Sequence, residues 1–177
     1  MIKPLFTLLT ALILGSLILT ISTAQAAEVN ITWTEPDKYR DIDSGTEGRK
    51  RFRENMFNEF EKHLSKLAKA LPASQILNID VTDIDLAGDV LASGLHQIRV
   101  IKDLYFPRIK LSFTLINAEK VIILSDNVNL KDMSFMMGGR LKYRNNALGY
   151  EKNCLMIGLK MLSQTMLINK RHIFNVI

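Results

Sequence analysis

The sequence predicts an α+β fold, a two-layer sandwich in which one long amphipathic helix packs on a mostly antiparallel sheet of about four to five strands. Three observations predict it. A short alternating segment precedes a long helical pattern, several alternating segments follow that pattern, and the turns between the later segments are short. Strands joined by short turns pair antiparallel, and one helix can cover one face of their sheet. The expected order is therefore strand, helix, strands.

The first strand is expected at Val29–Trp33, where β-branched and aromatic residues alternate with polar ones. The helix is expected after Ser44–Glu47, a Ser-x-x-Glu capping box. Its apolar residues recur at spacings of three and four, which places them on one stripe. They are Phe52, Met56, Phe57, Phe60, Leu64, Leu67, Ala68 and Leu71. We interpret the charged residues opposite as a solvated face rather than a lipid-binding one, and His63 as a boundary residue.

The later strands follow from period-two alternation. Residues 76–81 alternate, but at Asp83 the apolar phase shifts to Ile84 and Leu86, which predicts a β-bulge. Further strands are expected within residues 96–104, at 109–116 and at 121–124, with a hairpin turn over 117–120. Residues 125–132 are rich in serine, asparagine and aspartate and predict a loop.

The N-terminus has the pattern of a secretory signal peptide. Lys3 precedes an apolar run over Leu5–Ile21, and Ala24-Gln25-Ala26 follows with the small residues that a signal peptidase accepts. We therefore expect cleavage before Ala27 and a periplasmic location. An uncleaved membrane anchor is the alternative. The expected organisation is a signal peptide over 1–26, a single domain over 27–152 and an atypical hydrophobic tail over 153–177.

Charge and cysteine content limit the function classes. Removal of Lys3 with the signal peptide lowers the formal net charge from +5 to +4, and the sequence has no block of like charge. We therefore expect no nucleic-acid partner, and no membrane partner after cleavage. Cys154 is the only cysteine, so an internal disulfide is impossible. A catalytic thiol needs a nearby histidine, and nothing in the sequence places His63, His96 or His172 beside it.

The densest acidic group comprises Asp80, Asp83, Asp85 and Asp89. Its spacing departs from the calcium-loop pattern, so we expect no metal site there. Asp83 and Asp85 would share one face of a strand and could form an acid–base pair. No nucleophile clusters near them, so we favour a structural use with Arg99 or Arg108 as partners. Phosphate-loop, dinucleotide and zinc motifs are missing from the sequence, and we expect no cofactor.

Several segments together resemble a known family, exported proteobacterial proteins catalogued as domain of unknown function 3016. The matching segments are Val29-x-Ile31-x-Trp33 with Pro36, Tyr39-Arg40-Asp41, Leu71-Pro72, Asp83-Ile84-Asp85-Leu86-Ala87-Gly88, Arg99-Val100, Pro107-Arg108-Ile109, Leu130-x-Asp132 with Phe135, and Tyr150-Glu151. The stretch from Asp83 to Gly88 is the most specific of them. The resemblance implies no activity.

The leading hypothesis for function is a non-enzymatic periplasmic protein that binds an envelope protein or polymer, or that supports the envelope. The alternative is a small ligand-binding or hydrolytic domain. Its site would use the polar residues of the matching segments, with no catalytic residue assigned. These residues are Asp41, Asp83, Asp85, Arg99 and Arg108.

The tail departs from the resembling family after Lys152. Residues 153–162 are apolar on all sides, whereas the family continues with an amphipathic helix. Permitted codons for this stretch, read one base earlier, encode Leu-Leu-Asp-Asp-Trp-Phe. We therefore hypothesise a frameshift near Lys152 and expect a poorly packed tail; a divergent hydrophobic helix is the alternative.

Overall fold

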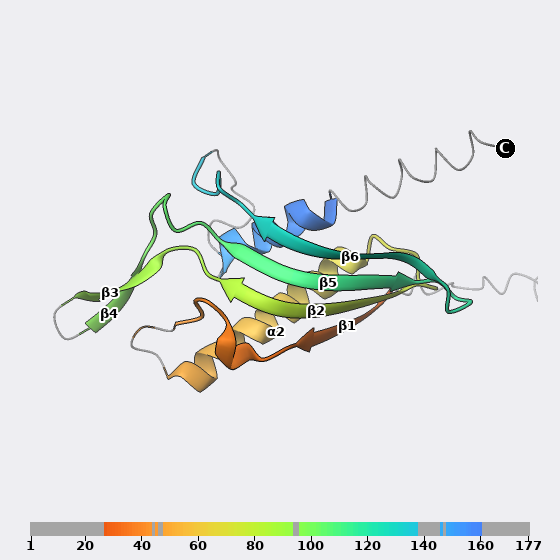
Figure 1. The fold of residues 1–177 in the computed structure, drawn as a ribbon, viewed down its shortest axis with the longest axis horizontal. Helices are drawn as coiled ribbons and strands as arrows, with labels where there is room; N and C mark the ends of the chain where they lie inside the picture. The colour runs from red at the N-terminus through yellow and green to blue at the C-terminus, as the bar shows by residue number, and fades with distance from the viewer. Residues whose placement is uncertain are drawn as a thin grey trace, which may run out of the picture.

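The computed structural model describes residues 27–43, 45, 48–93, 96–137, 146 and 148–160. The chain forms β1 (Glu28–Trp33), a 3₁₀ turn η1 (Pro36–Lys38), α2 (Arg49–Ala68), β2 (Ile76–Asp85), β3 (Asp89–Ser93), β4 (His96–Val100), β5 (Arg108–Ile116) and β6 (Ile122–Lys131). A second helix covers residues 149–160. The fold is α+β with a mostly antiparallel sheet, as expected (Figure 1).

The main sheet has the strand order β1-β2-β5-β6. β1 and β2 run parallel, and the other neighbours are antiparallel. The parallel pair follows from the chain between them, because parallel neighbours need a long crossover and α2 supplies it. The predicted bulge is confirmed, since the register of β2 against β5 shifts between Val81 and Asp83.

The strand predictions were wrong at two places. β3 and β4 form a separate two-stranded sheet, and β3 was not predicted. β6 runs on to Lys131, although residues 125–131 were expected as a loop. The strand pairs with β5 through backbone hydrogen bonds, which do not depend on side-chain polarity. Ser125 and Asn127 are exposed, so their polar side chains do not disturb the strand.

The helical layer differs from the single long helix that was expected. Met56, Phe60 and Leu64 of α2 are buried, as the stripe predicted, and join one core with the inward residues of β2 and β5. The helix of residues 149–160 packs beside them. A Cβ atom on its Gly158 would lie 2.5 Å from the Leu130 side chain of β6. The sheet face is therefore covered by two helices (Figure 1).

Two local expectations also change. α2 begins at Arg49 with Gly48 as its N-cap, and three residues of the predicted capping box, 44, 46 and 47, lie outside the described residues. His63 was expected at the boundary but is buried, with Nε2 2.9 Å from the carbonyl oxygen of Lys152.

The start of the predicted tail is packed. Asn153, Cys154 and Leu155 are buried, so the expectation of loose packing is wrong for these residues. Residues 161–177, like the predicted signal peptide over 1–26, lie outside the described residues. The frameshift remains a hypothesis. In the part of the chain that the structure describes, no helix is long and apolar enough to cross a membrane.

Candidate functional site

The five polar residues singled out by the sequence meet at one end of the main sheet. Asp85 of β2 lies opposite Arg108 of β5 in the strand register. Asp41, which follows η1, joins the end of β2 through an isolated parallel bridge to Asp85. Asp83 stands beside Asp85 beyond the bulge, and Arg99 reaches the group from β4. The topology therefore brings four separate segments to this end.

Arg99 is bound on several sides. Its Nη1 and Nη2 donate to the two carboxylate oxygens of Asp41 at 2.9 and 3.0 Å, which is the bidentate geometry of a strong ion pair. The same guanidinium donates to the carbonyl oxygens of Ala87, Gly88 and Asp43 at 3.3, 3.2 and 2.9 Å. Arg99 thus fixes the base of the β3–β4 hairpin to the body of the domain.

Asp85 lies between two arginines. Its Oδ2 is 3.4 Å from Arg108 Nη1 and 3.5 Å from Arg40 Nη1. Burial raises the pKa of Asp85, and the neighbouring guanidinium groups of Arg108 and Arg40 oppose this shift. Arg108 also stacks on the Phe106 ring, with Cζ 4.2 Å from the ring centroid. The carboxylate is therefore held between two cations at the end of the sheet.

Asp83 binds two groups that the sequence reasoning missed. Its Oδ1 accepts a hydrogen bond from the backbone N–H of Arg40 at 2.9 Å, and its Oδ2 is 3.3 Å from Lys110 Nζ. The alternation of β5 placed Lys110 on the same face as Arg108 and could have identified it. Tyr39 supports this arrangement, because its buried hydroxyl donates to Val81 O at 2.7 Å.

Glu151 is a further residue at this end of the sheet whose role the sequence reasoning missed. It is 3% exposed, and its Oε1 accepts a hydrogen bond from the backbone N–H of Ala87 at 2.7 Å. Burial raises the pKa of Glu151 above its ordinary value. Ala87 is therefore held by Glu151 through its N–H and by Arg99 through its carbonyl oxygen.

The start of the second helix is tied to two more elements. Lys152 Nζ lies 2.7 Å from Glu59 Oε2 of α2. Asn153 Nδ2 donates to Asp132 Oδ2 at 2.9 Å, just after β6. These polar contacts fix Lys152, the last residue of the predicted domain, and Asn153, the first residue of the predicted tail.

The chemistry available at this end of the sheet is limited by the ion pairs. Asp41, Asp83 and Asp85 each have a cationic partner, and Asp80 accepts a hydrogen bond from Thr34 Oγ1 at 2.6 Å. Within the described ranges, no group of three or more His, Cys, Asp or Glu residues is placed to hold a metal ion. The arrangement can fix backbone segments relative to one another, which is a positioning role.

The buried Glu151 predicts a pH dependence of stability. Its pKa in the folded protein is raised above the ordinary value of 4.5, so the unfolded chain ionises first as the pH rises. Glu151 therefore destabilises the fold progressively as the pH rises from about 4.5 through the raised pKa. The variant Glu151→Gln should not lose stability in this way. Its free energy of unfolding should therefore rise relative to that of the native chain as the pH increases above about 4.5.

The matched control is Glu59→Gln. Hydrogen bonds from Lys152 and Lys62 lower the pKa of Glu59, so its stabilising contribution is lost as the pH falls. Urea unfolding at a series of pH values measures both effects. If the free energy of unfolding depends on pH in the same way for Glu151→Gln and for the native chain, a raised pKa at Glu151 is contradicted.

Most of the segments that carry the resemblance meet at this end of the sheet. They include Tyr39-Arg40-Asp41, Asp83 to Gly88, Arg99-Val100, Pro107-Arg108-Ile109, Leu130 to Phe135, and Tyr150-Glu151. Fold and site thus define a small α+β domain with an ion-paired brace. The model of the family described as "Protein of unknown function (DUF3016)" matches residues 27–159, and the chain belongs to this family. No curated protein and no solved structure matches the chain significantly.

Proposed function

We propose that this is an exported, periplasmic protein that acts by binding a protein of the cell envelope and has no catalytic activity. The β3–β4 hairpin makes the contact. The observation that carries this proposal is the hairpin itself, a separate two-stranded sheet that projects from the body of the domain (Figure 1). An isolated hairpin is at best marginally stable in water. The Arg99–Asp41 pair at its base supplies the missing support.

The hairpin presents an apolar pair to solvent. Leu91 and Ile98 are directly opposite each other in the register, so they share one face, and they are 38% and 49% exposed. Arg99 follows Ile98 and points to the other face, toward the body. A rigid arm with an exposed apolar pair suits an apolar recess on a folded protein better than a polar polymer.

Site-specific photocrosslinking tests this proposal. A photoreactive residue in place of Ile98 should give one discrete protein adduct in intact cells, and Arg99→Ala should reduce that adduct by loosening the hairpin. The matched control is Ser125, which is also exposed on a strand but lies on β6. Equal adducts at positions 98 and 125, or adducts with glycan alone, would contradict a protein partner at the hairpin.

Export is tested separately. The family match begins at residue 27, where the proposed cleavage site lies, and this agreement supports the proposal. We expect protein from the periplasmic fraction to have the intact mass of a chain that begins at Ala27. A mass that still includes residues 1–26 would favour an uncleaved anchor.

A second candidate function is binding of a small anion at the ion-paired cluster. It is favoured by the side chains of Arg40 and Lys110, which are 47% and 44% exposed. It is also favoured by Arg108 Nε, which is buried and makes no hydrogen bond within the described part of the chain. Inorganic phosphate should then shift the amide signals of these residues saturably, and Lys110→Gln should abolish the shift. Unchanged spectra would exclude this candidate.

A further inference from the structure

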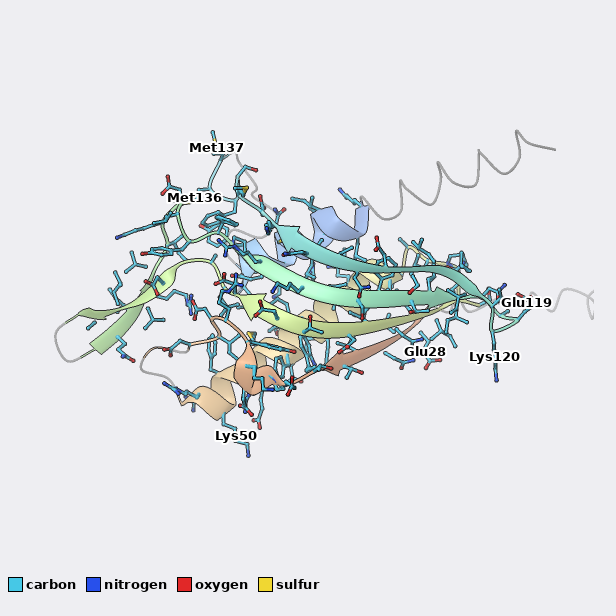
Figure 2. The ribbon with its side chains drawn as sticks, in the orientation of Figure 1. Glu28, Lys50, Glu119, Lys120, Met136 and Met137 are labelled. Carbon is cyan, nitrogen blue, oxygen red and sulfur yellow. The ribbon has the colours of Figure 1, made fainter. Side chains whose placement is uncertain are left out.

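The loop that follows β6 exposes three methionines within five residues. Met133, Met136 and Met137 are 72%, 50% and 75% exposed, and the last two are labelled at the outer edge of the molecule in Figure 2. Methionine is normally among the buried residue types, and apolar groups gathered on a surface often mark a contact site. The three thioethers therefore require a specific explanation.

The backbone of this loop is held in a defined shape. Asp132 N donates to Pro107 O at 3.2 Å, which fixes the start of the loop to the segment before β5. Phe135 N donates to Asp132 O at 3.2 Å, and Met137 N donates to Ser134 O at 2.9 Å, so two turns overlap. Phe135 is 3% exposed and anchors the loop inward, which leaves the methionines on the outside.

The Phe135 anchor is itself supported by the second helix. Its ring meets Tyr150 edge to face, with ring centroids 4.9 Å apart. Met133, Met136 and Met137 lie within five residues of this turn-rich loop, so their backbone positions are close together along the chain. The three rotatable bonds of each methionine side chain let the sulfur atoms turn toward a common point.

The donor set determines which ligand this loop suits. Thioether sulfur is a soft ligand that selects copper(I) and related monovalent cations over hard cations such as calcium and magnesium. The adjacent carboxylate, Asp132, is buried and accepts a hydrogen bond from Asn153, so it does not add a hard ligand. Thioethers also carry no proton to lose, so binding needs no deprotonation, unlike binding by cysteine or histidine.

We propose that Met133, Met136 and Met137 form a binding site for a soft monovalent cation of the copper(I) class, with their three sulfur atoms as ligands. The loop backbone is already fixed, so binding orders only the side chains. This site lies on a different loop from the hairpin and is independent of the hairpin's partner.

Silver(I) serves as a probe that does not change oxidation state. Titration of the full chain in a chloride-free nitrate buffer, followed by native mass spectrometry and calorimetry, should show one silver ion per chain. The ε-methyl signals of the three loop methionines should shift, whereas that of Met56, which is 2% exposed, should not. Copper(I) should displace silver(I), and the affinity should be equal at about pH 5 and pH 7 because no ligand deprotonates.

Leucine substitutions separate a metal site from an apolar docking surface, because leucine keeps the apolar surface and removes sulfur. Met133→Leu, Met136→Leu and Met137→Leu should each weaken silver binding by more than about tenfold, a loss that even outer-shell changes can cause. The triple variant should abolish it while its circular dichroism spectrum is unchanged. Met56→Leu and Cys154→Ala are the controls and should bind like the native chain. Native affinity in the triple variant, or loss of binding in Cys154→Ala, would overturn the proposal.

Discussion

Phe60→Ala should lower the free energy of unfolding by about 3–5 kcal/mol. Phe60 is 1% exposed at the centre of the α2 stripe, and its ring lies 6.1 Å from that of Trp33, measured between centroids. Removal of the ring leaves a cavity between α2 and the main sheet that neighbouring side chains fill only in part. Urea unfolding, followed by circular dichroism and by the fluorescence of Trp33, measures the loss.

Leu104→Ala is the matched control for this prediction. Leu104 is a large apolar residue that is 69% exposed, so its truncation should change the free energy of unfolding by less than about 0.5 kcal/mol. A loss below about 1 kcal/mol for Phe60→Ala would show that the helix is not held by its apolar stripe.

Gly88→Ala should destabilise the protein by at least about 2 kcal/mol. Gly88 has a φ of 85°, and a Cβ atom there would lie 2.6 Å from the carbonyl oxygen of Val100. This neighbour is backbone of β4 and cannot rotate away. Gly88 also donates from its N–H to Tyr105 O at 2.8 Å and accepts from Arg99 at 3.2 Å, so a shift of its backbone would weaken both bonds.

Gly48→Ala provides the comparison. Gly48 has a φ of −60°, and no atom lies within 4 Å of the position that a Cβ would take. Its replacement at the helix N-cap should cost less than about 1 kcal/mol. Thermal unfolding of the two variants side by side measures the difference. Equal losses would contradict a specific requirement for glycine at position 88.

The sequence predicted the elements whose apolar residues follow a strict period. The stripe of α2 and the alternation in β2 and β5 were correct because each element buries one face. The bulge at Asp83 was visible as a slip in that alternation. β6 was predicted too short because its second half exposes Ser125, Asn127 and Asn129 at an edge of the sheet, which hid the inward residues Val128 and Leu130 that pack against the core.

The residues of the candidate site were predicted, but their partners only in part. Arg108 pairs with Asp85 as expected, whereas Arg99 pairs with Asp41 and Asp83 binds Lys110. Asp41, Asp83, Asp85, Arg99 and Arg108 do come together at one end of the sheet. Their pairing depends on how η1, β2, β4 and β5 meet in space, which local patterns do not encode. Burial of Glu151 is likewise invisible in the sequence, because an isolated glutamate in a helix normally faces solvent. The resemblance included Tyr150-Glu151 but gave no role for it.

Hydrogen exchange of the backbone amides tests most directly whether the ion pairs hold the hairpin in place. Asp41→Asn keeps the shape of the side chain but removes the charge that pairs with Arg99. Amides of β3 and β4 should then exchange at least about tenfold faster, while those of β2 and β5 keep their native rates. Unchanged exchange in the hairpin, or equal acceleration throughout the sheet, would contradict a local brace.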